Sequence, residues 1–172
     1  MGTNPERHGQ VRDLGTALGN AGAGIAYGGG SRGLMGVIAD AVLEAGGHAY
    51  GVIPGSLVEK EEAHQGLTQL EIVEDMHQRK ARMAHLGDAF LALPGGMGTA
   101  EEFFEIWTWQ YLGFHHKPVG LYNVGGFWDP MLAMVDHMVE EGFMAPWRRE
   151  SLLVARTPDE VVSMMHHAVG AG

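Results

Sequence analysis

The chain has 172 residues, of which 45% are hydrophobic and 19% charged, a composition typical of one globular domain with its own core. The formal net charge of −10 argues against nucleic acid as the main partner, because an acidic surface repels a phosphate backbone. The absence of cysteine excludes disulfides and thiolate chemistry. No apolar run approaches the roughly 20 residues of a membrane span, and the polar N-terminus lacks a signal-peptide pattern. We therefore expect a cytoplasmic protein that binds neither nucleic acid nor membranes.

Helical and strand patterns alternate along the chain. Apolar periodicity and glycine or proline stop signals predict helices over 7–21, 34–45, 75–86, 99–112, 130–141 and 158–168. Short apolar runs predict strands over 24–27, 49–53, 89–93, 119–122 and 152–154. Strands that are apolar throughout, each followed by a helix, indicate a parallel sheet that is buried on both faces. The fold class is thus α/β: a single Rossmann-like domain over 1–172, doubly wound, with helices on both faces of a parallel sheet.

Two glycine-rich loops follow predicted strands, where such folds bind ligands. One runs from Gly28 to Gly36 and offers Arg32 as a possible cation; the other runs from Gly95 to Thr99, whose hydroxyl could join. Glycine lets backbone amides approach an anion, and the following helix start adds free N–H groups. Neither loop has a Walker A sequence, and neither fits the dinucleotide fingerprint well. The alternative is that these glycines only form tight turns, but two such loops at equivalent strand ends favour a bound ligand.

Carboxylates begin the helix after the second loop. At ~100° per residue, Glu101, Glu102, Glu105 and Thr108 fall in one sector, while Phe103 and its apolar neighbours point elsewhere, toward a core. The alternative is that these glutamates stabilise the helix dipole. That reading leaves unexplained why they stand at the mouth of a glycine loop, where they would repel an anion. A sugar is the better neighbour, because carboxylates bind hydroxyl groups and stabilise positive charge.

Basic residues concentrate in the helix over 75–86. Arg79 and Lys80 share a predicted face with Met76 and Met83, and arginine is suited to two-point recognition of phosphate. The alternative is a solvated basic stripe. It is less favoured because the chain has only 11 lysines and arginines, and three of them, Arg79, Lys80 and Arg82, lie within four positions. The ten histidines fit no zinc-site spacing, so we expect no metal.

Three segments, in order, resemble one protein family. The segment 94–102, PGGMGTAEE, matches the family motif PGGxGTxxE; 28–36 matches GGGxxGLMG; and 76–80 matches MHxRK. The chain is similar to the Lonely Guy family, the cytokinin riboside 5′-monophosphate phosphoribohydrolases, from about residue 21 to the C-terminal region.

The resemblance implies an enzyme that hydrolyses the N-glycosidic bond of adenine-type nucleoside 5′-monophosphates, giving free base and ribose 5-phosphate. The substrate would be adenosine 5′-monophosphate (AMP) or an N6-substituted AMP, with no cofactor, and the enzyme would be a homodimer. Arg79 and Glu102 correspond to the catalytic pair. The remaining expected substrate contacts are Glu61, Lys80, Gly95, Gly96, Met97, Gly98, Thr99, Ala100, Glu101 and Thr108, together with Gly29 and Gly30 of the first glycine loop.

One departure from the family concerns the N-terminus. Family members usually open with a strand and a glycine-serine loop before the first helix, whereas residues 1–6 lead straight toward that helix. We expect this strand to be missing, which would leave apolar strand edges exposed within the sheet.

Two rival functions use the same motifs. A non-catalytic nucleotide binder, resembling the molybdenum cofactor carrier proteins, would need the phosphate cradle but not a carboxylate beside it. A pyridoxal phosphate-dependent lysine decarboxylase, a label often given to this family, would need a Schiff-base lysine. The chain has only Lys60, Lys80 and Lys117, none in a recognisable cofactor setting.

Overall fold

The computed structural model describes residues 4–170, and these form two compact units that meet in the sequence between Gly87 and Asp88. Residues 1–3, part of the segment in which the family's opening strand is expected to be missing, lie outside the described residues, as do 171–172.

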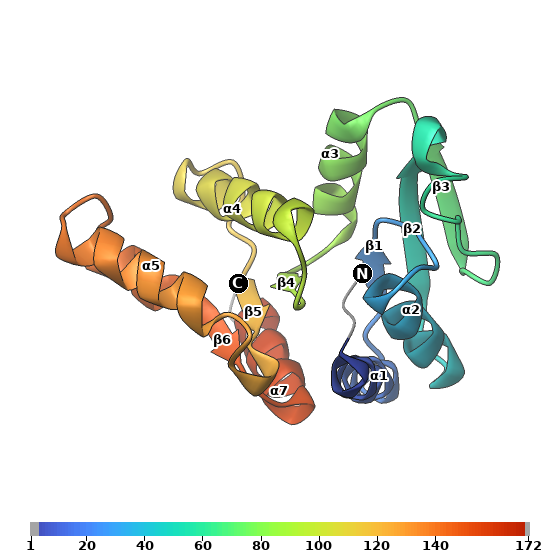
Figure 1. Ribbon diagram of the computed structural model, residues 1–172, viewed down its shortest axis with the longest axis horizontal. Coiled ribbons are helices and arrows are strands. Elements are labelled where there is room, and N and C mark those ends of the chain that lie inside the picture. Colours follow the sequence, from blue (N-terminus) through green and yellow to red (C-terminus); the bar gives the residue numbers. More distant parts are fainter. Residues whose placement is uncertain (1–3, 171–172) are drawn as a thin grey trace. The chain divides into compact units, whose positions relative to one another are not determined.

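The first unit is a three-stranded parallel sheet with three α-helices. In chain order its elements are α1 (Pro5–Asn20), β1 (Ile25–Tyr27), α2 (Leu34–Glu44), β2 (Ala49–Pro54), the short 3₁₀-helix η1 (Gly55–Leu57), β3 (Gln69–Val73) and α3 (Met76–Leu86). The strand order is β1-β2-β3, and the register places Ile25 opposite Ala49 and Tyr50 opposite Gln69. Figure 1 shows α1 and α2 on one side of this sheet and α3 on the other.

Small residues bring α1 and α2 together. A Cβ added at Gly15 would lie 2.6 Å from the Cβ of Ala41, and one at Gly19 would lie 2.6 Å from the Cβ of Ala45. The two helices thus approach too closely for a larger side chain at either glycine. Val42 of α2 and Ala49 of β2 are fully buried. Removing such apolar side chains from water stabilises the packing of this unit.

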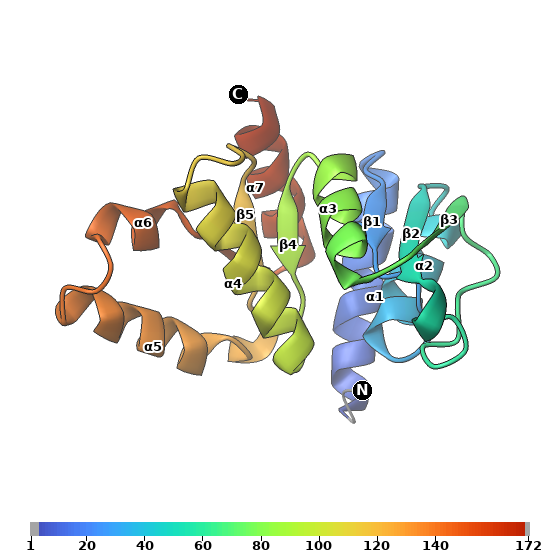
Figure 2. The same cartoon turned by 90° about the horizontal axis from the view of Figure 1, so that it is seen from above.

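The second unit repeats the same design. Its elements are β4 (Phe90–Ala92), α4 (Met97–Tyr111), β5 (Val119–Tyr122), the 3₁₀-helix η2 (Val124–Gly126), α5 (Asp129–Glu140), α6 (Pro146–Ser151), β6 (Leu153–Ala155) and α7 (Pro158–Gly170). The parallel strand order is β4-β5-β6, with Phe90 opposite Val119. Figure 1 shows α4 and α7 on opposite sides of this sheet, and Figure 2 shows the turn over 141–145 that separates α5 from α6.

An aromatic core holds the second unit together. Buried side chains of α4, β5 and α5, of the residue before α5 and of the residue between α6 and β6 form one cluster: Phe103, Trp107, Val119, Leu121, Trp128, Leu132, Val135 and Leu152. Asn123, which directly follows β5, is fully buried. Its side chain accepts a hydrogen bond from the Trp128 amide and donates one to Asp129, both at 2.7 Å. This amide therefore fixes the turn from β5 into α5.

The α/β class, the parallel pairing and every predicted helix and strand are confirmed, with ends that differ by one or two residues. One strand and one α-helix were not predicted, nor were the two short 3₁₀-helices. Strand β3 follows β2 without an intervening α-helix, so the expectation that a helix follows every strand is wrong there. It is also half-exposed, with Ile72 63% accessible, so it lacks the continuous apolar pattern of a buried strand. Helix α6, with only six residues, is too short to show a period.

Strands β1 and β4 are outer strands of their sheets, since each pairs with one neighbour among residues 4–170. The single domain over 1–172 and the missing strand stay predictions. Within the described chain, no helix is both long and apolar enough to cross a membrane. The cytoplasmic location also stays a prediction.

Candidate functional site

Arg79 of α3 is a buried cation at the start of the first glycine loop. The N-cap of this helix is Asp75, whose carboxylate accepts the Gln78 amide at 2.8 Å. Arg79 follows on the face turned to the sheet and is only 6% exposed. Its Nη2 donates to the carbonyl of Gly28 at 3.1 Å. The alternative of a solvated basic stripe is therefore wrong for this residue.

Glu61 holds the other side of the Arg79 guanidinium. Arg79 Nη2 lies 3.2 Å from Oε2 of Glu61, and Nη1 lies 3.4 Å from Oε1, a two-point arrangement that suits arginine. Arg79 Nε is buried and finds no partner within the described chain. A buried charge needs compensation, which Glu61 supplies. The pairing of Glu61 with Arg79 could not be read from their separation of 18 residues.

The glycines of the first loop are required by this packing. A Cβ at Gly28 would lie 1.8 Å from Arg79 Nη2. Gly29 has φ +76°, a conformation that side chains disfavour. A Cβ at Gly30 would lie 3.1 Å from the Glu61 carbonyl oxygen and 2.9 Å from Met35 Cε. The first loop is therefore shaped to hold Arg79 and Glu61.

Two other basic side chains of this unit pair with carboxylates. Arg32, considered as a cation for the glycine loop, instead forms an exposed ion pair with Glu62. Arg82 pairs with Glu71 of β3 at 2.8 Å. Lys80 lies next to Arg79 on α3 and is half-buried. Of the cations of this unit that the sequence suggested, the buried one is Arg79, whose side chain donates to the Gly28 carbonyl.

The second glycine loop leads from β4 into α4. Gly96 is the N-cap residue and offers no side chain to the first turn, and the amide of Ala100 is bonded to the Gly96 carbonyl at 3.1 Å. The helix begins at Met97, two residues before the predicted start. Amides at such a helix start are suited to anion binding, because they point outward along the positive end of the helix dipole.

The glycines of this loop are used differently from those of the first. A Cβ at Gly95 would lie 2.1 Å from Oγ1 of Thr99, so the threonine side chain lies back over the loop. At Gly96 and Gly98 a Cβ would meet no atom within 4 Å. Neither residue has a positive φ. The tight-turn reading therefore does not explain these two glycines, and the space above their backbone is open.

Helix α4 separates its polar and apolar faces as predicted. Phe103 and Trp107 are buried, whereas Glu101 and Thr108 are exposed and Glu102 is half-buried. The helix thus presents a carboxylate-rich face that starts next to the second loop. Ala100, which the resemblance also implicates, lies in the first turn.

Comparison with known proteins identifies the family. A family model described as "Possible lysine decarboxylase" matches residues 35–165. The cytokinin riboside 5′-monophosphate phosphoribohydrolase of Rhodococcoides fascians is 49% identical over 152 residues, 87% of this chain and 77% of the relative. This chain belongs to that phosphoribohydrolase family. A phosphoribohydrolase of Arabidopsis thaliana, LOG3, is 47% identical over 153 residues, 89% of this chain and 71% of the relative.

Solved structures share the fold of this family at lower identity. The molybdenum cofactor carrier protein of Chlamydomonas reinhardtii aligns with a TM-score of 0.72 and 19% identity, over 99% of this chain and 91% of the other. The X-ray structure of TM1055 aligns with a TM-score of 0.73 and 24% identity, over 97% and 91%. At such identities the similarity concerns the fold alone.

Proposed function

We propose that this phosphoribohydrolase-family chain hydrolyses the N-glycosidic bond of adenine-type nucleoside 5′-monophosphates. The observation that carries the proposal is Arg79, a buried cation held between the Gly28 carbonyl and the Glu61 carboxylate. Burying a charge opposes folding unless it is well paired, so such a group indicates a functional site. Family relatives named as phosphoribohydrolases support the same chemistry.

In the proposed reaction a water molecule replaces the base on the sugar. The bond between C1′ of ribose and the base nitrogen breaks, and its electron pair leaves with the base. Positive charge builds up on the sugar, as in glycoside hydrolysis. We assign to Glu102 the stabilisation of that charge and the removal of a proton from the attacking water. The water oxygen bonds to C1′, the base takes up a proton, and ribose 5-phosphate is the second product.

The 5′-phosphate is the proposed anchor of the substrate. Amides of the loop Gly95–Thr99 would bind it at the start of α4, where Gly96 and Gly98 leave the backbone open. Arg79 would stabilise negative charge on the phosphate or on the leaving base. Further proposed contacts are Glu61, Lys80, Met97, Ala100, Glu101 and Thr108, with Gly29 and Gly30. Remote binding of the phosphate would then place the sugar for reaction at Glu102.

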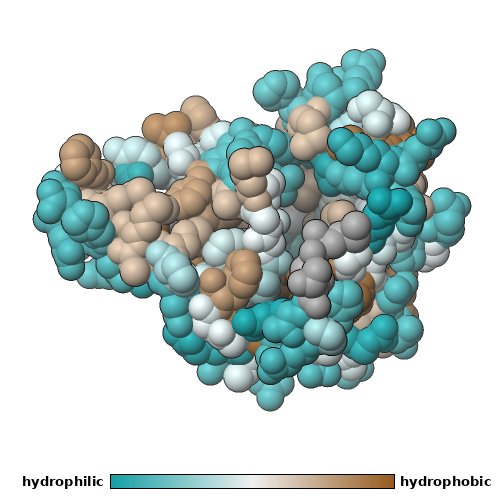
Figure 3. Space-filling view, viewed as in Figure 1, coloured by the Kyte–Doolittle hydropathy of each residue, from teal (hydrophilic) through white to brown (hydrophobic). Residues whose placement is uncertain are grey.

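A homodimer is the proposed assembly. Exposed apolar side chains gather on the second unit at Tyr111, Leu112, Phe114, Met134, Phe143 and Trp147, of which Phe143 is 88% accessible. Figure 3 shows apolar surface over the region of α5. Apolar patches of this kind mark interaction surfaces, because monomeric proteins rarely expose them. A second copy of the chain is the proposed occupant, and light scattering of the purified protein gives its mass directly.

The carrier alternative keeps the phosphate cradle without bond cleavage. The related fold of the Chlamydomonas reinhardtii carrier protein makes it the second candidate. Glu102 on the polar face of α4 argues for hydrolysis, because a binder of phosphate alone has no use for a carboxylate at that position. The lysine decarboxylase reading has little support, since none of the three lysines has a recognisable cofactor setting.

The test is release of free base. The protein is incubated separately with AMP and with N6-isopentenyladenosine 5′-monophosphate, and the base is quantified by chromatography. Glu102→Gln is the matched control, because it keeps the size of the side chain and removes its charge. Base release by the wild type and at least a hundredfold less by the variant is expected. Nucleotide binding without base release would contradict the proposal and favour the carrier.

A further inference from the structure

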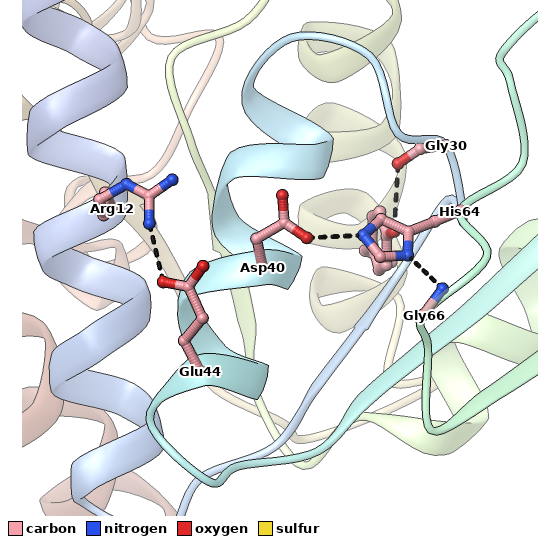
Figure 4. Close-up of polar contacts among 7 residues, drawn as sticks. Arg12, Gly30, Asp40, Glu44, His64 and Gly66 are labelled. Atoms are coloured by element: carbon pink, nitrogen blue, oxygen red, sulfur yellow. Dashed lines mark hydrogen bonds and ion pairs between the residues drawn. The ribbon is translucent and has the colours of Figure 1, made fainter.

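His64, three residues after Glu61 in the chain, lies in a polar cluster with Asp40 and Gly66. Its Nε2 lies 2.9 Å from Oδ1 of Asp40 on α2, and its Nδ1 accepts the Gly66 amide at 3.0 Å. Because Nδ1 accepts that bond, the ring proton is on Nε2 and is donated to Asp40. Figure 4 shows the imidazole between Asp40 and Gly66. The His64 side chain is 11% exposed, so the ring has little freedom to turn.

Residues 61–64, here called the Glu61 segment, are joined through their backbone to the first glycine loop. The His64 amide donates to the Gly29 carbonyl, and the Ser31 amide donates to the Glu62 carbonyl, both at 2.9 Å. These bonds flank an antiparallel bridge between Gly30 and Ala63. The residues just after Glu61 are therefore attached to the same loop whose Gly28 carbonyl accepts from Arg79.

The segment is held in a conformation that it would not adopt alone. Glu62, directly after Glu61, has φ +50°, and among the described non-glycine residues it alone has a positive φ. Such a residue persists where its surroundings fix it. Tyr27 strengthens the same loop by donating to the Gly30 carbonyl at 3.1 Å. Burial, and secondly the charge of Asp40, raise the pKa of this phenol, so it stays protonated and keeps donating.

We propose that His64 and Asp40 are positioning residues: they attach the Glu61 segment to α2 and to the first glycine loop and so set the orientation of Glu61 toward Arg79. The inference rests on the proposed hydrolysis only for its effect on rate. No part of the sequence motifs includes His64, and Asp40 lies 39 residues before Arg79, so neither was suggested by spacing. They act through Glu61, and no contact with substrate is assigned to them.

The test compares Asp40→Ala with Glu44→Ala. Both carboxylates lie on α2, but Glu44 pairs with Arg12 of α1 at 2.8 Å, whereas Asp40 contacts His64 (Figure 4). Asp40→Ala is expected to lower kcat/KM for AMP by about tenfold or more, because small misplacements of catalytic groups are costly. Glu44→Ala is expected to leave it within about twofold. Asp40→Asn, which keeps an oxygen for the Nε2 proton, is expected to restore most of the rate. Equal rates for Asp40→Ala and the wild type would overturn the proposal.

A double-mutant cycle separates positioning from general loosening of the fold. In a Glu61→Gln background, Asp40→Ala is expected to lower kcat/KM by less than about twofold, because the residue through which it acts is already altered. A loss as large as in the wild type would contradict the proposed route through Glu61. His64→Asn, which can keep an acceptor for Gly66 but not the bond to Asp40, is expected to match Asp40→Ala.

A readout that needs no activity keeps the two proposals distinguishable. The ¹H–¹⁵N signal of Arg79 Nε, a buried group, reports on the guanidinium without substrate. Asp40→Ala is expected to shift it, and Glu44→Ala to leave it in place. An unmoved signal in Asp40→Ala would overturn the positioning role. A shifted signal in a protein that releases no base from either nucleotide would refute the proposed function and leave the positioning role standing.

Discussion

The two glycine-rich loops look alike in sequence but use their glycines for different purposes. In the first, Gly28 and Gly30 make room for Arg79, Met35 and Glu61. In the second, Gly96 and Gly98 face open space and have ordinary backbone angles. A glycine whose Cβ would clash with another residue is explained by packing within the chain. A glycine with open space above it is better explained by a ligand that comes close to the backbone.

This contrast indicates that the two loops have different roles. The first loop positions a charged pair through contacts within its own unit, so changes there should affect stability and activity together. Gly96 and Gly98 of the second loop expose backbone at a helix start, so changes at these two positions should affect activity alone. Substitutions of glycine by alanine can test the distinction, because the same added methyl group meets the Arg79 side chain at Gly28 and open space at Gly98.

The largest expected effect is that of Gly28→Ala. The new Cβ would fall 1.8 Å from Arg79 Nη2, so the guanidinium must leave the Gly28 carbonyl. We expect at least a hundredfold loss of kcat/KM for AMP, and a loss of stability of about 1–3 kcal/mol, typical of overpacking. Denaturant unfolding and base release measure the two effects. Gly9→Ala in α1, where nothing lies within 4 Å, is the control and should be neutral or slightly stabilising. A fully active Gly28→Ala protein would show that Arg79 need not occupy its observed position.

A smaller effect, on activity only, is expected for Gly98→Ala. The residue lies in the first turn of α4, where alanine is favoured over glycine by up to about 1 kcal/mol. We expect unchanged or raised stability, with kcat/KM for AMP about tenfold lower as the methyl group meets the phosphate. Thermal unfolding beside the base-release assay separates the two. Unchanged kinetics would mean that no ligand approaches this backbone, and the contrast between the loops would fail.

The smallest expected effect concerns acid stability of the first loop. The hydrogen bond from Arg32, and secondly its charge, lower the pKa of Glu62. A lowered pKa in the folded state means that the pair stabilises the fold above the ordinary pKa of glutamate, and this contribution is lost as the pH falls through the lowered value. Glu62→Gln should therefore flatten the acid side of the melting-temperature profile slightly. The pair is exposed and the change is small; an unaltered profile would show that Arg32 contributes nothing to the loop.

Most of the fold could be predicted from the sequence, because helix periodicity and apolar strands are local signals. Strand β3 was not predicted, because its half-exposed face breaks the apolar pattern. The polar and apolar faces of α4 were also predictable. The contacts of Arg79 with Gly28 and Glu61 could not be predicted, because they join residues 51 and 18 positions apart and no local pattern pairs them. Glu61 entered only through the family resemblance, and His64 was not suggested at all, because a lone histidine outside a motif carries no readable partner.

The most direct measurement compares AMP with adenosine as substrates of the wild-type protein, by kcat/KM for release of free adenine. The two differ only in the 5′-phosphate that the second glycine loop is proposed to hold. We predict that AMP is cleaved at least a hundredfold more efficiently, because phosphate binding places the sugar for reaction. Equal efficiency for AMP and adenosine would contradict this phosphate-anchored reaction, since the loop would then have no part in it.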